Sequence, residues 1–277
     1  MYKGLGNNLE DIANKRFGQN FLKDRIVLNK IIKAIPNNQL PIVEIGAGLG
    51  DLTRQLINVG QVRAYEVDKR LCEYLKNEFK ESIESGRLEL VCKDILNISG
   101  SLHKQEFSLI ANLPYYIATK IVLNALHDSN CRNIMVMVQK EVAEKFAATT
   151  GKKEFGALSV LAQSIGEVEI LFDVLPSSFV PPPKVTSAIL SIRKRDSLKD
   201  LEFESFLKIV FKQPRKTLFK NLSAKYDKEL LNGIFKTLDI HKTARAHQLE
   251  LPKYHHLYKE LKKDIVDESR EQQRARE

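Results

Sequence analysis

The sequence predicts an α/β fold, and three observations lead to this prediction. Short runs rich in β-branched and apolar residues recur between residues 42 and 138, and most segments between them have helical periodicity. A glycine-rich turn follows the first of these runs. After Pro176 the pattern changes to amphipathic segments rich in lysine and arginine. Alternating strands and helices are typical of a doubly wound, mostly parallel sheet.

Five runs of four to six residues are predicted to be the strands of this sheet. Parallel strands of an open α/β sheet end along one edge, and ligands bind outside that edge. Residues directly after the strands are therefore the first candidates for a site. The five runs are 42–45, 62–66, 87–91, 107–111 and 133–138.

We predict two domains. Residues 1–190 form the α/β domain with the ligand site, and residues 191–277 form a small helical domain. The proline-rich stretch PSSFVPPPKV, which begins at Pro176, marks the change between them. The last eleven residues, 267–277, carry mostly charged side chains, so we expect a frayed, charged tail.

The net charge of +9 is unevenly distributed along the chain. Residues 1–36 hold 7 basic and 3 acidic groups, residues 37–183 hold 15 and 18, and residues 184–277 hold 22 and 14. A near-neutral body with basic ends suits an enzyme whose substrate is a polyanion. The alternative interpretation is that the excess lies on solvated helix faces.

The cysteines, the histidines and the lengths of the apolar runs argue against a disulfide framework, a metal site and a membrane span. Cys72, Cys92 and Cys131 are odd in number and far apart in the sequence, so we expect reduced core thiols. His255 and His256 are adjacent, which places them on different faces of a helix, and we assign no metal. No run approaches the ~20 apolar residues of a membrane span and no signal core is present, so we expect a cytoplasmic protein without a membrane partner.

The glycine-rich turn, EIGAGLGDLT at 44–53, favours a nucleotide-like ligand. Gly46 and Gly48 lie between a strand and a helix, where missing side chains let a ligand approach the backbone. The dinucleotide motif would need a third glycine at position 51, which is Asp51. A carboxylate there would repel a pyrophosphate. Glu44 and Asp51 instead favour the cationic, phosphate-free cofactor S-adenosylmethionine, although such a turn can also be purely structural.

Two acidic residues follow the next strands. Glu66 ends the second strand, where a carboxylate can accept both ribose hydroxyls of an adenosine. Asp94 follows the third strand and can accept a hydrogen bond from the adenine amino group. Taken alone, Glu66 reads as a surface acid and Asp94 as a helix N-cap. Together with the glycines they line the ligand-binding edge.

The pentapeptide NLPYY at 112–116 follows the fourth strand. This pentapeptide would face the methyl group of the predicted cofactor, and adenine N6 is a methyl acceptor that such a set of residues could assist. N6 is a weak nucleophile because its lone pair is delocalised into the ring. Acceptors for its hydrogens, such as the Asn112 side-chain oxygen and the Pro114 carbonyl, would favour the pyramidal nitrogen of the transition state. Tyr115 can stack on an extruded base, and we expect Tyr116 to pack in the core. A strand-ending turn with buried tyrosines is the structural alternative.

Seven motifs in one order resemble the small-subunit (16S) ribosomal RNA adenine N6-dimethyltransferases of the KsgA/RsmA type. The resemblance extends from about Lys15 to about Leu251. It implies a Rossmann-like class I S-adenosylmethionine-dependent methyltransferase domain with a small C-terminal helical domain that binds rRNA. The motifs are KRFGQNFLKD, EIGAGLGDLT, YEVDKRL, KDIL, NLPYYIAT, SSFVPPPKVTSA and QPRKTLFKNL.

Such a family transfers four methyl groups to N6 of two adjacent adenosines in a hairpin near the 3′ end of small-subunit rRNA, on an assembling 30S subunit. The resemblance also implies roles for individual residues, and we expect a monomer. Phe179 would face the target adenine opposite Tyr115, with Asn112 and Pro114 as acceptors. The implied cofactor-binding residues are Asn20, Leu22, Gly46, Gly48, Glu66, Asp94 and Asn112.

Two positions depart from the family pattern. Thr186 stands where the family usually has Asp, which puts a local hydrogen bond in doubt. Pro214 stands where a basic residue is usual, which puts a phosphate contact or a helix start in doubt. Three alternatives remain open: an Erm-type methyltransferase of large-subunit rRNA, a nucleic-acid-binding relative without catalysis, and, more remotely, an NAD-dependent enzyme.

Overall fold

The computed structural model describes residues 9–14, 17–195 and 200–274, with only the backbone from 264 onward. The chain forms two compact units. The first contains Met1–Glu144 and Ile165–Leu198, and the second contains Lys145–Ser164 and Lys199–Glu277. The predicted boundary at 190 differs from this division, because an internal segment belongs to the second unit and the last strand of the first unit extends past 190.

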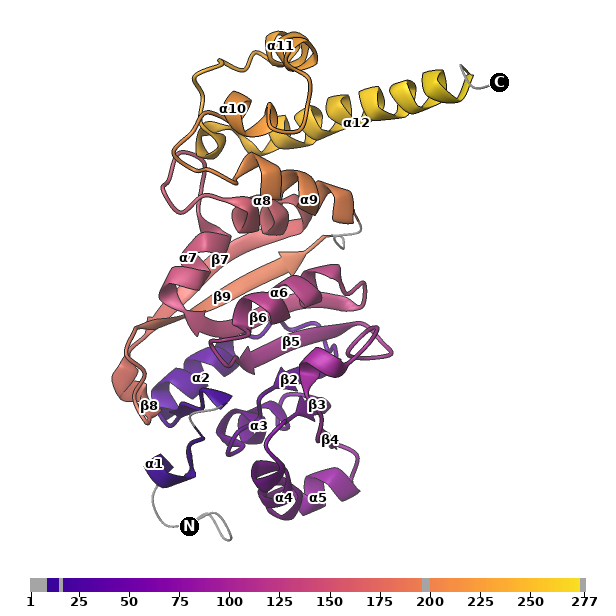
Figure 1. Cartoon of the computed structure of the whole chain (residues 1–277). Helices are drawn as coiled ribbons and strands as arrows, with labels where there is room; N and C mark the ends of the chain where they lie inside the picture. Colours follow the sequence, from indigo (N-terminus) through magenta and orange to yellow (C-terminus); the bar gives the residue numbers. More distant parts are fainter. Residues whose placement is uncertain (1–8, 15–16, 196–199, 275–277) are drawn as a thin grey trace. The chain divides into compact units, whose positions relative to one another are not determined.

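The first unit is built around a seven-stranded sheet with the order β4-β3-β2-β5-β6-β9-β7 (Figure 1). The five predicted strands are confirmed and form the parallel part. Two strands that were not predicted follow, and β9 is antiparallel to both β6 and β7. The strands are β2 (Ile42–Ile45), β3 (Val62–Tyr65), β4 (Leu88–Val91), β5 (Phe107–Asn112), β6 (Cys131–Gln139), β7 (Gly166–Val174) and β9 (Ser187–Lys194).

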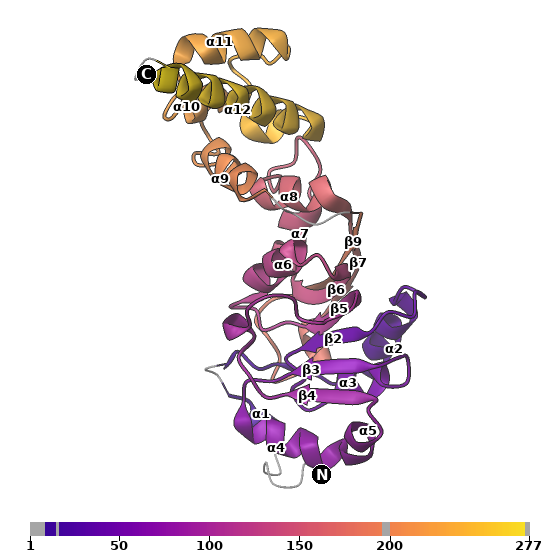
Figure 2. The same cartoon turned by 90° about the vertical axis from the view of Figure 1, so that its right-hand side faces the viewer.

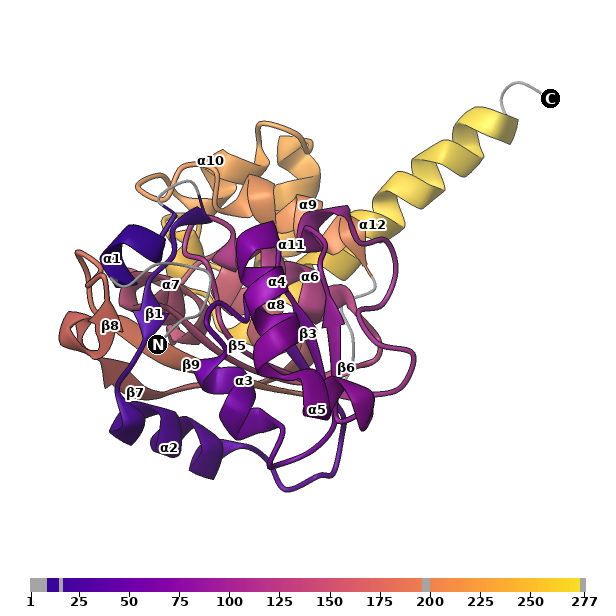
Figure 3. The ribbon, with the colours of Figure 1, turned by 90° about the horizontal axis from the view of Figure 1, so that it is seen from below.

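Helices cover both faces of the parallel strands, which is why β2 is buried along its whole length. Figures 2 and 3 show α2 and α3 on one side of the strands and α6 on the other. Asp24 caps the start of α2 through the N–H groups of Ile26 and Val27, and Asp68 caps α4. The helices are α1 (Leu9–Ile12), α2 (Arg25–Ala34), α3 (Asp51–Leu56), α4 (Lys69–Glu78), α5 (Lys80–Glu84) and α6 (Ala118–His127).

The prediction of three reduced cysteines is wrong for two of them. Cys72 lies in the first turn of α4, and Cys92 directly follows β4. Because β3 and β4 are parallel neighbours, both end at the same edge of the sheet, where Cys72 and Cys92 form a disulfide with their Cα atoms 6.0 Å apart. Cys131 is a buried free thiol, as predicted.

The second unit is helical, as predicted. Its core contains Tyr254, which is fully buried and packs against Phe155 and Phe211. Helix α12 continues to Arg274 where a frayed tail was predicted, and residues 275–277 lie outside the described part. No helix in the described part of the chain is long and apolar enough to cross a membrane. The helices are α7 (Lys140–Ala147), which begins in the first unit, α8 (Ala157–Ile165), α9 (Leu201–Val210), α10 (Leu218–Leu222), α11 (Lys228–Thr237) and α12 (Leu251–Arg274).

Candidate active site

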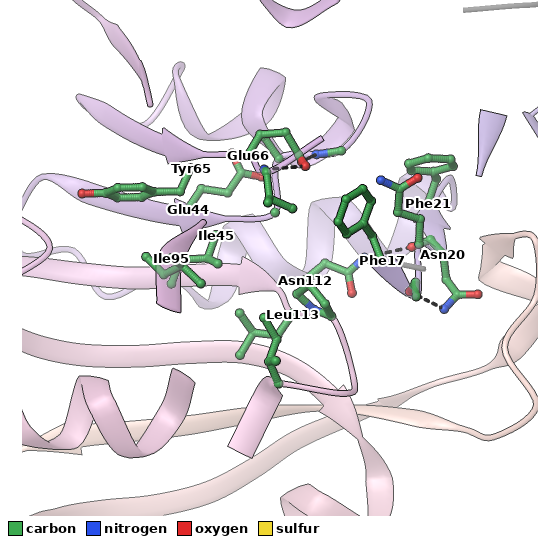
Figure 4. A pocket seen from close by; sticks show the side chains of 18 of the residues that line it. Phe17, Asn20, Phe21, Glu44, Ile45, Tyr65, Glu66, Ile95, Asn112 and Leu113 are labelled. Carbon is green, nitrogen blue, oxygen red and sulfur yellow. Dashed lines mark hydrogen bonds between the residues drawn. The ribbon is translucent and has the colours of Figure 1, made fainter. Parts of the chain in front are cut away.

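A cavity lies at the carboxyl ends of the parallel strands (Figure 4). Its walls come from the segments after β2, β3, β4 and β5 and from residues 17–22, which we call the strap. All but one of the predicted site residues line this cavity, and the exception is Phe179. The residues brought together are Asn20, Leu22, Gly46, Gly48, Glu66, Asp94, Asn112, Pro114 and Tyr115.

The glycine turn leaves its backbone open to the cavity. Gly46 and Gly48 have φ values of 78° and 61°, which side-chain-bearing residues rarely adopt. A Cβ at Gly48 would also lie 3.3 Å from the ring of Phe21 in the strap. The sequence therefore needs glycine here both for the turn and for the passage of the strap.

Glu66 is held by three backbone N–H groups. One carboxylate oxygen accepts from Gly48 at 2.9 Å, and the other accepts from Val67 and Asp68 at 2.9 Å each. The side chain is buried, which raises the pKa of Glu66, and the three backbone donors offset part of that rise. The carboxylate is fixed in the cavity wall, in the position predicted for a ribose acceptor (Figure 4).

Asp94 caps a short helical turn and also lies in the cavity wall. One of its oxygens caps a 3-10 turn, Ile95–Asn97, by accepting from the N–H of Leu96 at 2.9 Å. The half-buried residue also lines the cavity. A carboxylate has a second acceptor oxygen, which can receive an amino group of a ligand.

Glu44 and Asp51 contribute less negative charge to the cavity than the sequence implied. Lys23 pairs with Asp51 at 2.5 Å and compensates its charge. Burial raises the pKa of Glu44 to about 8, against the effect of a 2.6 Å hydrogen bond from Thr53, so this carboxyl is mostly protonated at neutral pH. The fit of a cofactor therefore depends on Glu66, Asp94 and the glycine turn.

Asn112 ends β5 and points into the cavity (Figure 4). Its amide nitrogen donates to the backbone oxygen of Asn20, 3.2 Å away in the strap. A carbonyl can only accept, so the NH₂ group must face Asn20 and the side-chain oxygen remains as an acceptor. The Pro114 carbonyl accepts from the N–H of Ile117 at 3.2 Å and keeps a second lone pair.

Both tyrosines lie in environments that differ from the predicted ones, which were a ring free to stack on a base for Tyr115 and the core for Tyr116. Tyr115 is half-buried, and its hydroxyl bonds the hydroxyl of Ser187 at 2.6 Å. Tyr116 was expected in the core, but it is 61% exposed and lines the cavity beside Gly18. The prediction failed because the turn after Pro114 carries the two adjacent side chains to different sides.

Phe179 does not face the cavity in this structure. It belongs to β8 (Phe179–Val180), which pairs with β1 (Phe21–Leu22), and the Leu22 to Phe179 pairing turns the ring into the core. Only 2% of Phe179 is exposed. The expected position opposite Tyr115 is therefore not seen.

Sequence reasoning gave no role to Gln19 and Asp68. Gln19 lines the cavity from the strap, and its side-chain nitrogen donates to Asp68 at 3.3 Å. Both residues lie in motifs that carried the resemblance, GQNFL and YEVDKRL. Nothing in their spacing indicates that they meet, because they are 49 residues apart.

The donor set fits S-adenosylmethionine. Acceptors are available for ribose hydroxyls and an adenine amino group, while the start of α3 carries Asp51 where a pyrophosphate would need N–H groups and positive charge. Within the described residues, no three His, Cys, Asp or Glu side chains are grouped so as to hold a metal ion. This sheet with this site defines a class I S-adenosylmethionine-dependent methyltransferase.

Comparison with known proteins narrows the class. A sequence model described as "Ribosomal RNA adenine dimethylase" matches residues 10–263, and the chain belongs to that family. Proteins called ribosomal RNA small subunit methyltransferase A are 52% identical in Sulfurimonas denitrificans (90% of this chain, 93% of that protein) and 50% identical in Helicobacter hepaticus (91% and 92%).

Two solved structures are similar over most of the chain. A dimethyladenosine transferase from Plasmodium falciparum has a TM-score of 0.76 and 25% identity, with 88% of this chain and 98% of that chain covered. The 23S rRNA methyltransferase ErmE has a TM-score of 0.69 and 26% identity, covering 88% and 100%. Both are similar in fold to this chain; the name of ErmE specifies 23S rRNA, and the name of the Plasmodium protein specifies no RNA.

Proposed function

We propose that the protein is an rRNA adenine N6-dimethyltransferase that uses S-adenosylmethionine to place four methyl groups on two adjacent adenosines near the 3′ end of small-subunit rRNA. It would act as a cytoplasmic monomer on an assembling 30S subunit. The observation that carries this proposal is the acceptor oxygen of Asn112 at the edge of a cavity that fits S-adenosylmethionine, in a chain of the ribosomal RNA adenine dimethylase family.

When bound, S-adenosylmethionine supplies an electrophilic methyl group. In this proposal Glu66 accepts hydrogen bonds from the ribose hydroxyls, and Asp94 accepts one from the adenine amino group. Asn20 and Leu22 contact the cofactor from the strap. Gly46 and Gly48 let the ligand approach the backbone. No strong base is needed: the N–C bond would form as the methyl–sulfur bond breaks and S-adenosylhomocysteine leaves, and the positively charged N6 would then lose its proton to water.

The acceptors at the sheet edge act on the target adenine. The Asn112 oxygen and the Pro114 carbonyl hold the N6 hydrogens, which favours the pyramidal nitrogen and stabilises the positive charge that develops on it. Tyr115 offers a ring face to the extruded base, and its hydroxyl is fixed by Ser187. Phe179 is not part of this proposal, because its ring is buried.

A basic loop in the helical unit is suited to RNA phosphates. Lys212, Arg215, Lys216 and Lys220 are exposed around the start of α10, and Thr217 caps that helix. The side chain of Asn221 is buried and donates to the carbonyls of residues 210 and 213, so the loop has a fixed shape. A fixed array of cations supports the predicted rRNA-binding role of residues 191–277.

The structure places both positions that depart from the family pattern. Pro214 is exposed and precedes the cap of α10, so it removes a charge without interrupting the helix. The backbone carbonyl of Thr186 accepts from the N–H of Lys140 at 3.0 Å. That contact needs no particular side chain at 186.

Labelled S-adenosylmethionine and unmethylated small or large ribosomal subunits, supplied separately, test the proposal. We expect label in the small subunit, on N6 of two neighbouring adenosines. Label in the large subunit alone would support the alternative that the fold of ErmE suggests, an enzyme for large-subunit rRNA. Strong RNA binding without label in either subunit would support the non-catalytic alternative.

A further inference from the structure

Asp68 contacts both the predicted ribose acceptor and the strap. Its backbone N–H donates to Glu66 at 2.9 Å, while its carboxylate accepts from the side chain of Gln19 at 3.3 Å. The same carboxylate accepts from the backbone N–H of Arg70 at 3.0 Å and from the Arg70 guanidinium at 2.7 Å. The side chain is 4% exposed.

These contacts fasten the N-terminal segment to α4. Besides pairing with Asp68, the Arg70 guanidinium donates to the backbone oxygen of Ile12 at 3.3 Å. The side-chain oxygen of Gln19 accepts from the N–H of Asn14 at 2.8 Å. Burial of Asp68 opposes ionisation, but the hydrogen bonds from Arg70 and Gln19 lower its pKa, so the carboxylate stays charged and holds both partners.

The strap in turn sets the orientation of Asn112. Residue 20 follows the Gln19 anchor directly, and its carbonyl receives the Asn112 NH₂ group. If the strap moves away, the amide can rotate by half a turn and present hydrogens to N6, which itself carries hydrogens. Such an amide would repel the substrate nitrogen instead of accepting from it.

We propose that Asp68 is a positioning residue, which holds the strap over the cofactor cavity and through Asn20 fixes the Asn112 amide as an acceptor. This inference deepens the proposed function and rests on it for its effect on rate. Its effect on the strap and on cofactor affinity does not depend on which RNA is methylated.

The test is Asp68→Asn, with Asp227→Asn as matched control. Asparagine caps helices as well as aspartate, so the start of α4 is kept while the charge that holds Arg70 and Gln19 is lost. Asp227 caps α11 in the helical unit in the same manner, accepting from the N–H groups of Glu229 and Leu230. Neither of these two hydrogen bonds involves a residue of the strap.

Three measurements separate positioning from simple stability. In cofactor-free protein, hydrogen exchange of peptide 17–22 should be at least about tenfold faster in Asp68→Asn than in the parent and the control. Calorimetry should show about tenfold weaker binding of S-adenosylmethionine. The single-turnover rate at saturating cofactor and RNA should fall about tenfold, and adding Asp68→Asn to Asn112→Ala should cause little further loss.

A lower melting temperature with unchanged exchange, affinity and rate would show that Asp68 only caps α4, and would overturn the inference. Additive losses in the double variant would overturn the link to Asn112. If Asp68→Asn does not fold, Arg70→Gln releases the same carboxylate from a half-exposed position and carries the same three tests. A parent that binds cofactor but methylates no small subunits would count against the proposed function, while exchange and affinity would still decide the role of Asp68.

Discussion

The cofactor cavity and the basic loop of the helical unit are suited to different kinds of interaction, short hydrogen bonds in the cavity and attraction between charges in the loop. In the cavity, Asp51 is paired with Lys23 and the pKa of Glu44 is raised to about 8 by burial, which leaves Glu66 and Asp94 as the carboxylates available to a ligand. Groups there act at hydrogen-bond distance and direct individual lone pairs. In the loop around Arg215 and Lys216 the cations are exposed, and under the proposed function they would act together on phosphates over longer distances. Substitutions in the cavity should therefore change rate or cofactor affinity, and those in the loop should change the salt dependence of RNA binding.

The largest effect should come from Asn112→Ala. Loss of one preorganised acceptor that acts mainly in the transition state costs on the order of 10²–10³ in rate. Single-turnover rates at saturating RNA and cofactor measure it, with the RNA dissociation constant nearly unchanged. Asn77→Ala, on the exposed face of α4, serves as control. Methylation at the parental rate would mean that the amide is structural.

Glu66→Ala should mainly weaken cofactor binding. Hydrogen bonds to charged groups contribute roughly 1.5–3 kcal/mol, which corresponds to a roughly ten- to hundredfold higher dissociation constant. Titration calorimetry with S-adenosylmethionine gives this value directly. An unchanged dissociation constant in the alanine variant would remove Glu66 from the site.

Replacing Arg215 and Lys216 by alanine should leave cofactor affinity intact and reduce the salt dependence of RNA binding. Two lost phosphate contacts should flatten the log–log slope by roughly 1.4–1.8. The control is the pair Lys80 and Arg87, which are exposed in the α/β unit. If both pairs change the slope equally, the basic loop has no special role in RNA binding.

Glu44→Gln should have the smallest effect, and it should depend on pH. The folded pKa of about 8 lies above the ordinary value of 4.5, so the stability contributed by protonated Glu44 is present below about pH 4.5 and is lost as pH rises through about 8. Glutamine keeps an acceptor for Thr53 and does not titrate. The melting temperature of the variant minus that of the parent should therefore increase from pH 5.5 to pH 8.5, by roughly 2–4 °C for each kcal/mol of stability that the parent loses. A constant difference over this range would show that Glu44 is ionised in the folded state.

The sequence by itself determined the features that depend on neighbouring residues. Short runs of apolar and β-branched residues predicted the five parallel strands, because the composition of four to six neighbouring residues is a local property. Since parallel strands end on one edge, the positions of Gly46, Glu66, Asp94 and Asn112 after successive strands were enough to predict that they line one cavity.

Tertiary structure alone decided the features that depend on contacts between distant segments. Pairing of β1 with β8 buried Phe179, and the α4–α5 crossover brought Cys72 to Cys92. The path of the strap brought Gln19 to Asp68, 49 residues away in the sequence, and Asn20 to Asn112, 92 residues away. Burial and hydrogen-bond partners follow from the path of the whole chain, so no local pattern encodes which side of the Asn112 amide faces the strap.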